Sequence, residues 1–330
     1  MSDTKKRILS GMRPTGQLHL GHLLGALQNW VSLQDQYECY FMVADWHSLT
    51  TNYEDIGPIR EYTYDNVADM LAAGIDPVKS VLFVQSQVLE HAELSLLLGM
   101  LTPIPWLERV PTYKEQIQEL SNKDLSTFGF LGYPLLQAAD ILIYKANAVP
   151  VGVDQVPHIE LTREIARRFN NFYGDIFPEP ESLLTPVSKL AGLDGRKMSK
   201  SYGNSIYLSD TPKIIEDKAK LMVTDPARIK RTDPGHPDVC PVFSYHKVFA
   251  PQVIGEIRDA CENAKIGCVE CKKRLAAELI ETLAPHQARR AELAKDKDKI
   301  RTILEEGNQR AKITAEQTMC KVRKAMKLTQ

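Results

Sequence analysis

The segment RILSGMRPTGQLHLGH, residues 7–22, decides which fold this sequence can adopt. Residues 7–10 predict a short β-strand, and the next six combine two glycines with a proline, which is typical of a tight turn. A helix is expected next, because apolar side chains recur at the i, i+3 and i+4 spacing of one buried helical face. That face consists of Leu20, Leu23, Leu24, Leu27, Trp30 and Val31. A strand, a turn and a helix in this order predict the first unit of a parallel α/β sheet.

The same alternation continues along the first half of the chain. Nearly all-apolar strands and amphipathic helices follow one another, as expected for a sheet with helices on both faces. Strands are expected at 38–45, 81–84 and 148–151, and helices at 59–74, 92–101, 133–144 and 154–169, the last capped by Asp154. Pro178 and Pro180 predict the start of a loop that continues to residue 204. The predicted fold class is α/β, a doubly wound parallel sheet with a C-terminal helical domain.

The chain has 330 residues, which is long enough for two domains. We expect the sheet domain at 1–205 and the helical domain at 206–330, because the patterns after about Ser209 are helical. Residues 102–130 contain Pro103, Pro105 and Pro111 and have fewer apolar side chains. They are therefore predicted to be an insertion in the sheet domain.

Composition and charge narrow the function classes. Hydrophobic residues make up 43% of the sequence and charged residues 25%, the balance of an ordinary soluble globular protein. The 41 basic and 42 acidic residues give a net charge of −1, so no basic excess marks a nucleic-acid-binding protein. Basic residues between 289 and 327 alternate with acidic ones, which leaves a solvated helix surface and an RNA-facing stripe both open. No apolar run reaches 18 residues and the N-terminus lacks a signal-peptide pattern, so we expect a cytoplasmic protein without membrane spans.

Two histidines stand where the first turn passes into the first helix. His19 and His22 are three residues apart, so they fall on the same side of one helical turn. The amides and dipole of a helix N-terminus favour an anion there, and Gly21 leaves room for a nucleotide to approach the backbone. We interpret the imidazoles as hydrogen-bond donors to phosphate oxygens. The alternative is a pair of surface histidines near a helix cap.

A second candidate site is the glycine-rich basic loop at 192–204, which begins with GLDGRKMSKS. Lys197 and Lys200 are compact positive charges that suit phosphate. The glycines predict a mobile loop that can close over a ligand. The alternative is an exposed basic loop without a function, which is common for sequences of this composition.

Together these two segments resemble the signature sequences of the class I aminoacyl-tRNA synthetases. The first is the turn at 11–16 followed by His19-Leu20-Gly21-His22, and the second is Lys197-Met198-Ser199-Lys200-Ser201. The resemblance implies a Rossmann-like catalytic domain at 1–205, in which an amino-acid carboxylate attacks the α-phosphate of Mg²⁺-bound ATP and pyrophosphate leaves. The aminoacyl group would then pass to the terminal adenosine of a tRNA. His19, His22, Lys197 and Lys200 would be the catalytic residues that neutralise charge on the phosphates. The alternative, an inactive RNA-binding relative, is disfavoured because both signatures are intact.

The predicted helix at 133–144 carries a polar stripe on an otherwise apolar sequence. Tyr133, Gln137, Asp140 and Tyr144 share one face of this helix. A buried carboxylate needs a partner, so Asp140 is either a satisfied core residue or the acceptor of a ligand pocket. An indole N–H and a phenol hydroxyl both suit that acceptor. The stripe alone therefore does not distinguish tryptophan from tyrosine.

A more specific resemblance does distinguish them. The segments at 44–47 and 151–164, with the proline-containing first turn, are similar to the tryptophanyl-tRNA synthetases, and the similarity runs along the whole chain. This resemblance implies L-tryptophan, ATP and tRNA(Trp) as substrates, an anticodon-binding domain at 206–330, and a homodimer. We predict the 102–130 insertion as the dimer interface. The implied tryptophan-binding residues are Gly11, His47, Tyr133, Gln137, Asp140 and Gln155. The implied ATP-binding residues are Arg13, Pro14, Thr15, Gly21, His22, Gly152, Val153, Asp154, Lys197, Met198, Ser199, Lys200 and Ser201.

Four of the six cysteines form a spacing pattern. Cys240, Cys261, Cys268 and Cys271 leave gaps of 20, 6 and 2 residues. Because cytoplasmic thiols stay reduced, such a group indicates a metal site rather than disulfides, and both Zn²⁺ and an iron–sulfur cluster accept four thiolates. The spacing resembles that of a subset of bacterial tryptophanyl-tRNA synthetases, which implies a [4Fe-4S] cluster near the anticodon-binding region. Cys39 and Cys320 are predicted to be inert thiols.

Overall fold

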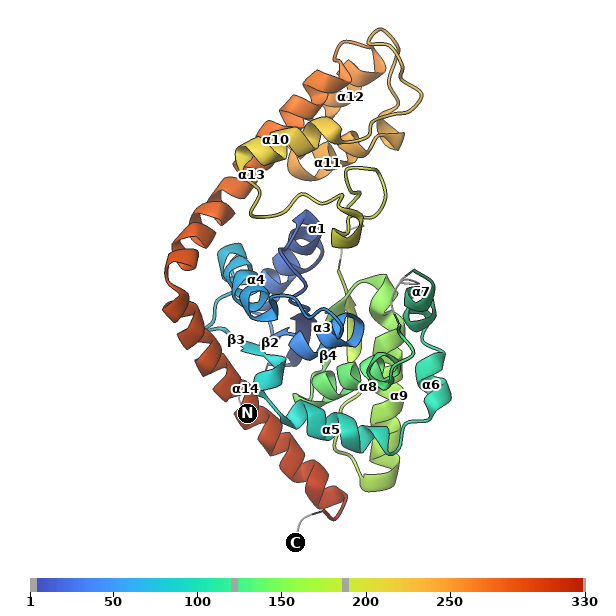
Figure 1. Cartoon of the computed structure of the whole chain (residues 1–330), viewed down its shortest axis with the longest axis vertical. Helices are drawn as coiled ribbons and strands as arrows, with labels where there is room; N and C mark the ends of the chain where they lie inside the picture. Colours follow the sequence, from blue (N-terminus) through green and yellow to red (C-terminus); the bar gives the residue numbers. More distant parts are fainter. Residues whose placement is uncertain (1–4, 120–123, 186–189, 329–330) are drawn as a thin grey trace. The chain divides into compact units, whose positions relative to one another are not determined.

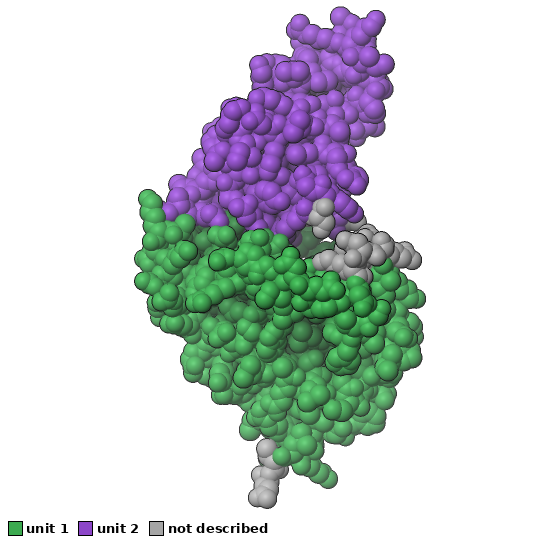
Figure 2. All heavy atoms as spheres, in the orientation of Figure 1, with its two compact units in different colours: residues 1–16, 26–186, 293–330 green, residues 17–25, 187–292 purple. Residues whose placement is uncertain are grey.

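A computed structural model of the chain describes residues 5–119, 124–185 and 190–328 (Figure 1). Residues 120–123 of the predicted insertion and 186–189 of the predicted loop lie outside the described part. The chain forms two compact units that are discontinuous in sequence (Figure 2). Unit 1 consists of Met1–Gly16, Ala26–Pro186 and Leu293–Gln330, and unit 2 of Gln17–Gly25 and Val187–Glu292.

Unit 1 is built on a five-stranded sheet in which every pair of neighbouring strands is parallel. The strands are β1 (Arg7–Met12), β2 (Glu38–Val43), β3 (Ser80–Val84), β4 (Ala148–Val151) and β5 (Glu181–Leu184). Their order across the sheet is β3-β2-β1-β4-β5. The prediction of a parallel α/β sheet is confirmed. The prediction of a continuous loop from Pro178 to residue 204 is wrong, because residues 181–184 form β5. This short edge strand has exposed or only partly buried side chains, so its sequence lacks the apolar run by which a strand is recognised.

The helices follow the predicted alternation, with bounds that shift by a few residues. Unit 1 contains α3 (Asp45–Asn52), α4 (Ile59–Ala73), α5 (Glu90–Gly99), α6 (Ile104–Glu108), α7 (Pro111–Glu119), α8 (Phe128–Ile143), α9 (Val156–Tyr173) and α14 (Lys297–Ala325). The first helical segment runs through α1 (Leu20–His22), a π-helical turn (Leu23–Leu27) and α2 (Gln28–Leu33). Unit 2 contains α10 (Pro212–Leu221), α11 (Pro241–Phe249), α12 (Ile254–Glu262) and most of α13 (Cys268–Lys295). Within the described ranges no helix combines the length and apolar character needed to cross a membrane.

One predicted helix cap is wrong. Asp154 does not cap α9, because it lies in a 3₁₀ turn at Val153–Gln155, and Gln155 occupies the cap position without a capping side-chain bond. The carboxylate of Asp154 is therefore left at the exposed end of β4.

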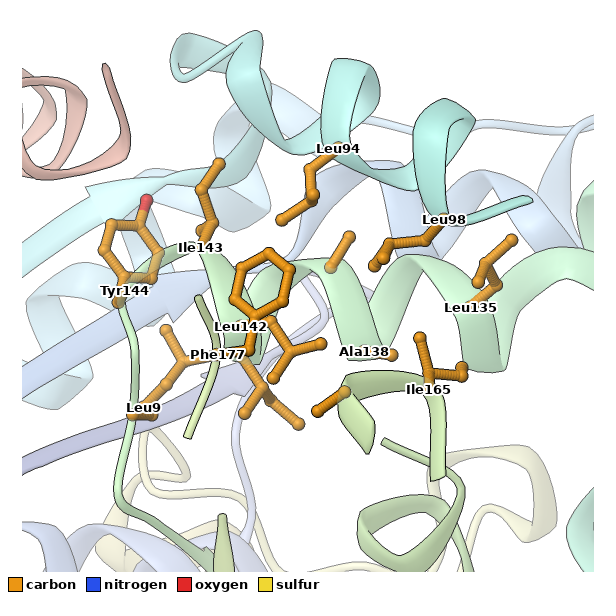
Figure 3. Close-up of a cluster of buried hydrophobic side chains, with 14 of the residues drawn as sticks. Leu9, Leu94, Leu98, Leu135, Ala138, Leu142, Ile143, Tyr144, Ile165 and Phe177 are labelled. Carbon is orange, nitrogen blue, oxygen red and sulfur yellow. The ribbon is translucent and has the colours of Figure 1, made fainter. Parts of the chain in front are cut away.

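Helix α8 lies at the centre of the hydrophobic core of unit 1. Its apolar face packs on α5 through Leu94 and Leu98 and on α9 through Ile165 (Figure 3). Ten of its sixteen residues are buried, Asp140 among them. The apolar character that drives this helix into the core thus also carries a carboxylate into it.

The last helix, α14, returns to unit 1 and covers the edge strand β3. The Val84 amide donates to Asn308 Oδ1 at 2.9 Å, and the Arg310 guanidinium donates to the Ser80 carbonyl at 3.2 Å. An edge strand has unpaired backbone groups that need such a cover. The compact units therefore do not follow the boundary expected at residue 205, since 293–330 belongs to the unit that contains the sheet.

The close approach of α14 to β3 depends on Gly307, because a Cβ atom at this position would overlap the Leu82 carbonyl. We expect Gly307→Ala to lower the melting temperature, since overpacking typically costs about 1–3 kcal/mol. Gly129→Ala is the matched control. Gly129 is an exposed residue in the first turn of α8 with no atom within 4 Å of a new Cβ, so this change should be neutral or slightly stabilising. Equal melting temperatures for the two variants would contradict the packing described here.

Candidate functional site

The carboxyl ends of four parallel strands meet at one edge of the sheet in unit 1. Open α/β sheets bind their ligands at this edge. The residues found there are Gly11 at the end of β1, Arg13 to Thr15 after β1, Ala44 to His47 after β2, Gln85 after β3, and Gly152 to Gln155 after β4. Glycine suits position 11 in the sheet, since a Cβ there would make a tight 3.2 Å contact with the neighbouring Met42. The structure therefore brings Gly11, Arg13, Pro14, Thr15, His47, Gly152, Val153, Asp154 and Gln155 to a common edge.

Asp140 of α8 is the centre of a hydrogen-bonded group that we call the Asp140 cluster: His47, Gln85, His91, Asp140 and Tyr144. His47 Nε2 lies 2.8 Å from Oδ2 of Asp140, and His91 Nδ1 lies 2.6 Å from Oδ1. The Gln85 amide donates to both oxygens, at 2.9 and 3.0 Å. Tyr144 completes the cluster, because its hydroxyl lies 2.7 Å from His91 Nε2. The polar stripe predicted on this helix thus places Asp140 and Tyr144 in one network.

The cluster keeps the Asp140 carboxylate ionised. Burial alone would raise its pKa, but the hydrogen bonds from His47 and His91 outweigh burial and lower the pKa to about 2. The Asp140 side chain is almost fully buried, as is His91, whereas His47 keeps 12% of its side chain exposed. Asp140 is therefore a buried negative charge that can only accept hydrogen bonds and that is open to solvent only near His47.

Tyr133, on the same helix, belongs to a different group. Its hydroxyl bonds Thr112 Oγ1 at 2.9 Å and His158 Nε2 at 3.2 Å, and Thr112 also bonds His158 at 2.9 Å. The Arg13 guanidinium interacts electrostatically with the Tyr133 phenol. Thr112 comes from α7, so the predicted insertion contributes a side chain next to a predicted site residue. Gln137 lies half-buried on α8 between Tyr133 and Asp140.

In unit 2, the two histidines of the first signature lie beside the second signature. Residues 18–20 pair with 206–208 through Leu20 N to Ile206 O (3.0 Å) and Leu208 N to Leu18 O (2.9 Å). A Cβ on Gly21 would be 3.9 Å from the sulfur of Met198. The segment at 17–25 therefore belongs to the unit that contains Lys197 and Lys200, and tertiary pairing explains why.

Both imidazoles are neutral near pH 7. Burial, followed by the nearby Lys200 ammonium, lowers the pKa of His19 to about 4. Burial, His19 and Lys200 also lower the pKa of His22 well below its ordinary value. His22 Nδ1 accepts the backbone N–H of His19 at 3.1 Å, so the proton of the neutral ring is on Nε2. The histidines can thus donate hydrogen bonds to an anion, whereas the positive charge comes from the lysines.

The loop that contains Lys197 and Lys200 is held by one buried side chain, Asn204. Its amide nitrogen donates to Asp194 Oδ1 at 2.7 Å and to the Lys197 carbonyl at 3.2 Å, and its amide oxygen accepts the Ser199 N–H at 2.9 Å. The Asn204 carbonyl accepts the Leu193 N–H at 2.9 Å. These bonds give the loop a defined conformation in which Met198 is buried. The side chain of Ser201 lies outside the described part.

The four predicted metal-ligating cysteines all lie in unit 2. Cys240 precedes α11, Cys261 is in α12, and Cys268 and Cys271 are in the first turn of α13. Burial and repulsion from the other three thiols raise the pKa of Cys271 to about 12. No group of three or more His, Cys, Asp or Glu side chains within the described ranges is arranged to hold a metal ion. The four thiols are therefore neighbours whose chemistry suits a metal, but they do not form a completed ligand set.

The sequence patterns did not identify three residues that hold these sites together: Gln85, His91 and Asn204. Gln85 directly follows the third buried strand, so its place at the carboxyl end of a parallel strand was an available signal. His91 and Asn204 offered no such signal. Each acts through a partner that is distant in sequence or through loop backbone groups, and only the folded chain brings these groups together.

The sequence and the structure both match known proteins. The sequence model of the tRNA synthetases of class I (W and Y) matches residues 1–284 of the 330. The chain belongs to this family. A tryptophan–tRNA ligase from Thermotoga maritima is 56% identical to the synthetase over 325 residues, which cover 98% of this chain and 99% of the relative. A tryptophan–tRNA ligase from Aquifex aeolicus is 46% identical over 393 residues, covering 98% and 100%.

A solved structure also resembles the synthetase along its whole length. It is a tryptophanyl-tRNA synthetase from Campylobacter jejuni complexed with ADP and tryptophan, with 32% sequence identity and a TM-score of 0.88. The similarity covers 97% of this chain and 99% of the other. The α/β sheet and the long C-terminal helices are therefore those of a class I synthetase.

Proposed function

We propose how this tryptophan–tRNA ligase distributes its two-step reaction over the residues described above. The ligase activity agrees with the tryptophan–tRNA ligases that match the whole chain. In the first step tryptophan reacts with Mg²⁺-bound ATP to give tryptophanyl-adenylate and pyrophosphate. In the second step the tryptophanyl group passes to the 3′-terminal adenosine of tRNA(Trp). The location in the cytoplasm stays a prediction.

The phosphates of ATP are assigned to unit 2. This assignment rests on the pairing of the His19–His22 segment with the backbone that directly follows the Lys197–Lys200 loop. Burial above all, and the nearby Lys200 to a smaller extent, lower the pKa of both histidines. Neutral imidazoles donate hydrogen bonds, and Lys197 and Lys200 stabilise the negative charge that grows on the leaving pyrophosphate. The expected ATP contacts also include Arg13, Pro14, Thr15, Gly21, Gly152, Val153, Asp154, Met198, Ser199 and Ser201.

Tryptophan is assigned to the edge of the sheet in unit 1. Asp140 is a buried charged acceptor, and an indole N–H is a donor only, so the two groups are complementary. His47 is the only partly exposed donor on Asp140 within the described cluster, so the indole approaches from that side. Gly11, Tyr133, Gln137 and Gln155 are the remaining expected contacts. The similar Campylobacter jejuni enzyme was solved in complex with ADP and tryptophan, which supports tryptophan and an adenine nucleotide as ligands of this chain.

We expect the first step to depend on the two lysines. Lys197→Ala or Lys200→Ala should slow ATP–pyrophosphate exchange by ~10²–10³, because each charge acts mainly on the transition state. The KM for tryptophan should change little. Lys213→Ala is the matched control, since Lys213 forms an exposed ion pair with Asp217 on α10 and should leave exchange unchanged. Unchanged exchange in both loop variants would refute the role of the loop.

The four cysteines are proposed to hold a [4Fe-4S] cluster, with Zn²⁺ as the alternative. Cys268 and Cys271 are three residues apart at the start of α13, a spacing that lets two thiolates reach one centre. Four neighbouring thiolates would repel one another without a cation. When bound, the cluster would join α11, α12 and α13, and its role in this proposal is structural support for tRNA binding.

Protein purified under anaerobic conditions should be brown and contain about four irons per chain, as a Cys₄ cluster requires. Cys268→Ser should lose the metal and weaken tRNA charging while preserving most ATP–pyrophosphate exchange. Cys320→Ser, at an exposed position on α14, is the matched control and should keep the metal. One zinc per chain, or no metal in anaerobic preparations, would exclude the iron–sulfur proposal.

A homodimer is proposed, with the interface at the predicted insertion. Met100 follows α5 and Ile104 begins α6, and they expose 72% and 59% of their surfaces. Leu96 on α5 and Phe128 at the start of α8 expose 61% and 86%. Exposed apolar side chains can mark protein interfaces, so we place the interface along this stretch of the chain.

We therefore expect the chain to sediment as a dimer and the double variant Met100→Glu/Ile104→Glu to sediment as a monomer. Two charges placed in a closed apolar interface would each be costly to bury. Val78→Glu changes an even more exposed apolar residue elsewhere in unit 1, and this variant should remain dimeric. A monomeric wild-type chain at micromolar concentration would contradict the proposal.

A further inference from the structure

The donors around Asp140 differ in their access to solvent. His91 and Gln85 are completely buried, whereas the His47 side chain is 12% exposed. Oδ1 of Asp140 receives His91 at 2.6 Å, and Oδ2 receives His47 at 2.8 Å. Gln85 donates to both oxygens, so the two oxygens differ in their histidines: Oδ1 has completely buried donors alone, whereas Oδ2 also receives the partly exposed His47.

Hydrogen bonding fixes the role of His91. A carboxylate can only accept hydrogen bonds, so the short contact to Oδ1 requires a proton on His91 Nδ1. In the neutral ring Nε2 is then the acceptor, and it faces the Tyr144 hydroxyl at 2.7 Å. Burial raises the pKa of Tyr144 well above its usual value, so this phenol keeps its proton and donates it. Tyr144 thus supplies the hydrogen bond that Nε2 needs in the tautomer of His91 that donates to Asp140.

The Tyr144–His91 pair is itself held in the core. The Tyr144 ring stacks on Tyr40 with centroids 4.6 Å apart and meets Phe83 edge-on at 5.3 Å. His91 also lies 6.0 Å from Phe83. This close packing restricts rotation of the Tyr144 and His91 rings, so Oδ1 of Asp140 has a fixed partner.

We infer that His91, backed by Tyr144, is a positioning residue for substrate selection that holds Oδ1 of Asp140 so that Oδ2 stays aimed at the indole N–H. This inference rests on the proposed role of Asp140 as the acceptor of that N–H. Without the His91 donor the Asp140 carboxylate keeps only Gln85 and His47, so it is held less firmly and its preference for a substrate that carries the N–H declines. A site built on one buried hydrogen bond discriminates strongly only while both groups stay in place.

The test compares tryptophan with β-(3-benzothienyl)alanine, in which sulfur replaces the indole N–H. The measured quantity is the ratio of their kcat/KM values in ATP–pyrophosphate exchange. His91→Leu should lower this ratio by roughly 10- to 100-fold, the range for a lost hydrogen bond to a charged group. The loss should be mainly in the KM for tryptophan. His91→Asn should restore most of the ratio, because its amide N–H reaches the position of Nδ1.

Two further variants make the result specific. Tyr144→Phe should lower the ratio by a smaller factor, since the Nδ1 donor remains but the buried Nε2 loses its hydrogen-bond partner. Tyr40→Phe removes a hydroxyl from the same ring stack, but one that bonds Glu38 and Thr314 instead of His91, so its ratio should equal that of the wild type. If His91→Leu does not fold, His91→Gln replaces it, because its amide reaches the Nε2 position rather than Nδ1. A lower ratio in His91→Gln than in His91→Asn supports the inference.

Equal losses of kcat/KM for both substrates in the His91 variants would mean a merely structural role and would overturn the inference. Asp140→Asn separates this outcome from a failure of the proposed function. If Asp140→Asn changes the ratio and the His91 variants do not, only the positioning role is wrong. If Asp140→Asn also leaves the ratio unchanged, Asp140 is not the acceptor of the indole N–H.

Discussion

A carboxylate can be buried in a protein only where donors surround it, and this constraint organises the proposed tryptophan site of the synthetase. Helix α8 is driven into the core by its apolar residues, and it carries Asp140 with it. The folded chain satisfies that charge with three donors taken from three different elements: His47 of α3, Gln85 after β3, and His91 of α5. The result is a permanent acceptor at the edge of the sheet where ligands bind in this fold.

The proposed nucleotide site depends on a different constraint, the need to bring separate sequence motifs together. The segment with His19 and His22 pairs with the backbone at 206–208, directly after the loop that contains Lys197 and Lys200. Asn204 then fixes the backbone of this loop. Neutral histidines beside positive lysines give a site that combines directed hydrogen bonds with charge, which suits the transfer of a nucleotidyl group.

The edge strand β3 explains why unit 1 is built from segments that are far apart in the sequence. Strand β3 exposes backbone groups that must find partners, and the only described helix that bonds them is α14, near the C-terminus. Gly307 permits the approach, and Asn308 and Arg310 supply the bonds. Helix α14 therefore completes unit 1, the same unit that contains the first strand, β1.

The sequence by itself determined the parallel α/β sheet, because each buried strand has an apolar run and each helix an apolar face that can be recognised locally. It also identified the histidines and lysines of the two signatures and singled out Asp140 as a carboxylate in an apolar helix. It did not locate β5, the return of α14, or the partners of Asp140. Those features depend on pairing between groups far apart in the chain, such as His91 with Asp140 or Asn308 with Val84. Local patterns report which side chains must be buried, but only the tertiary structure decides which distant donor meets which acceptor.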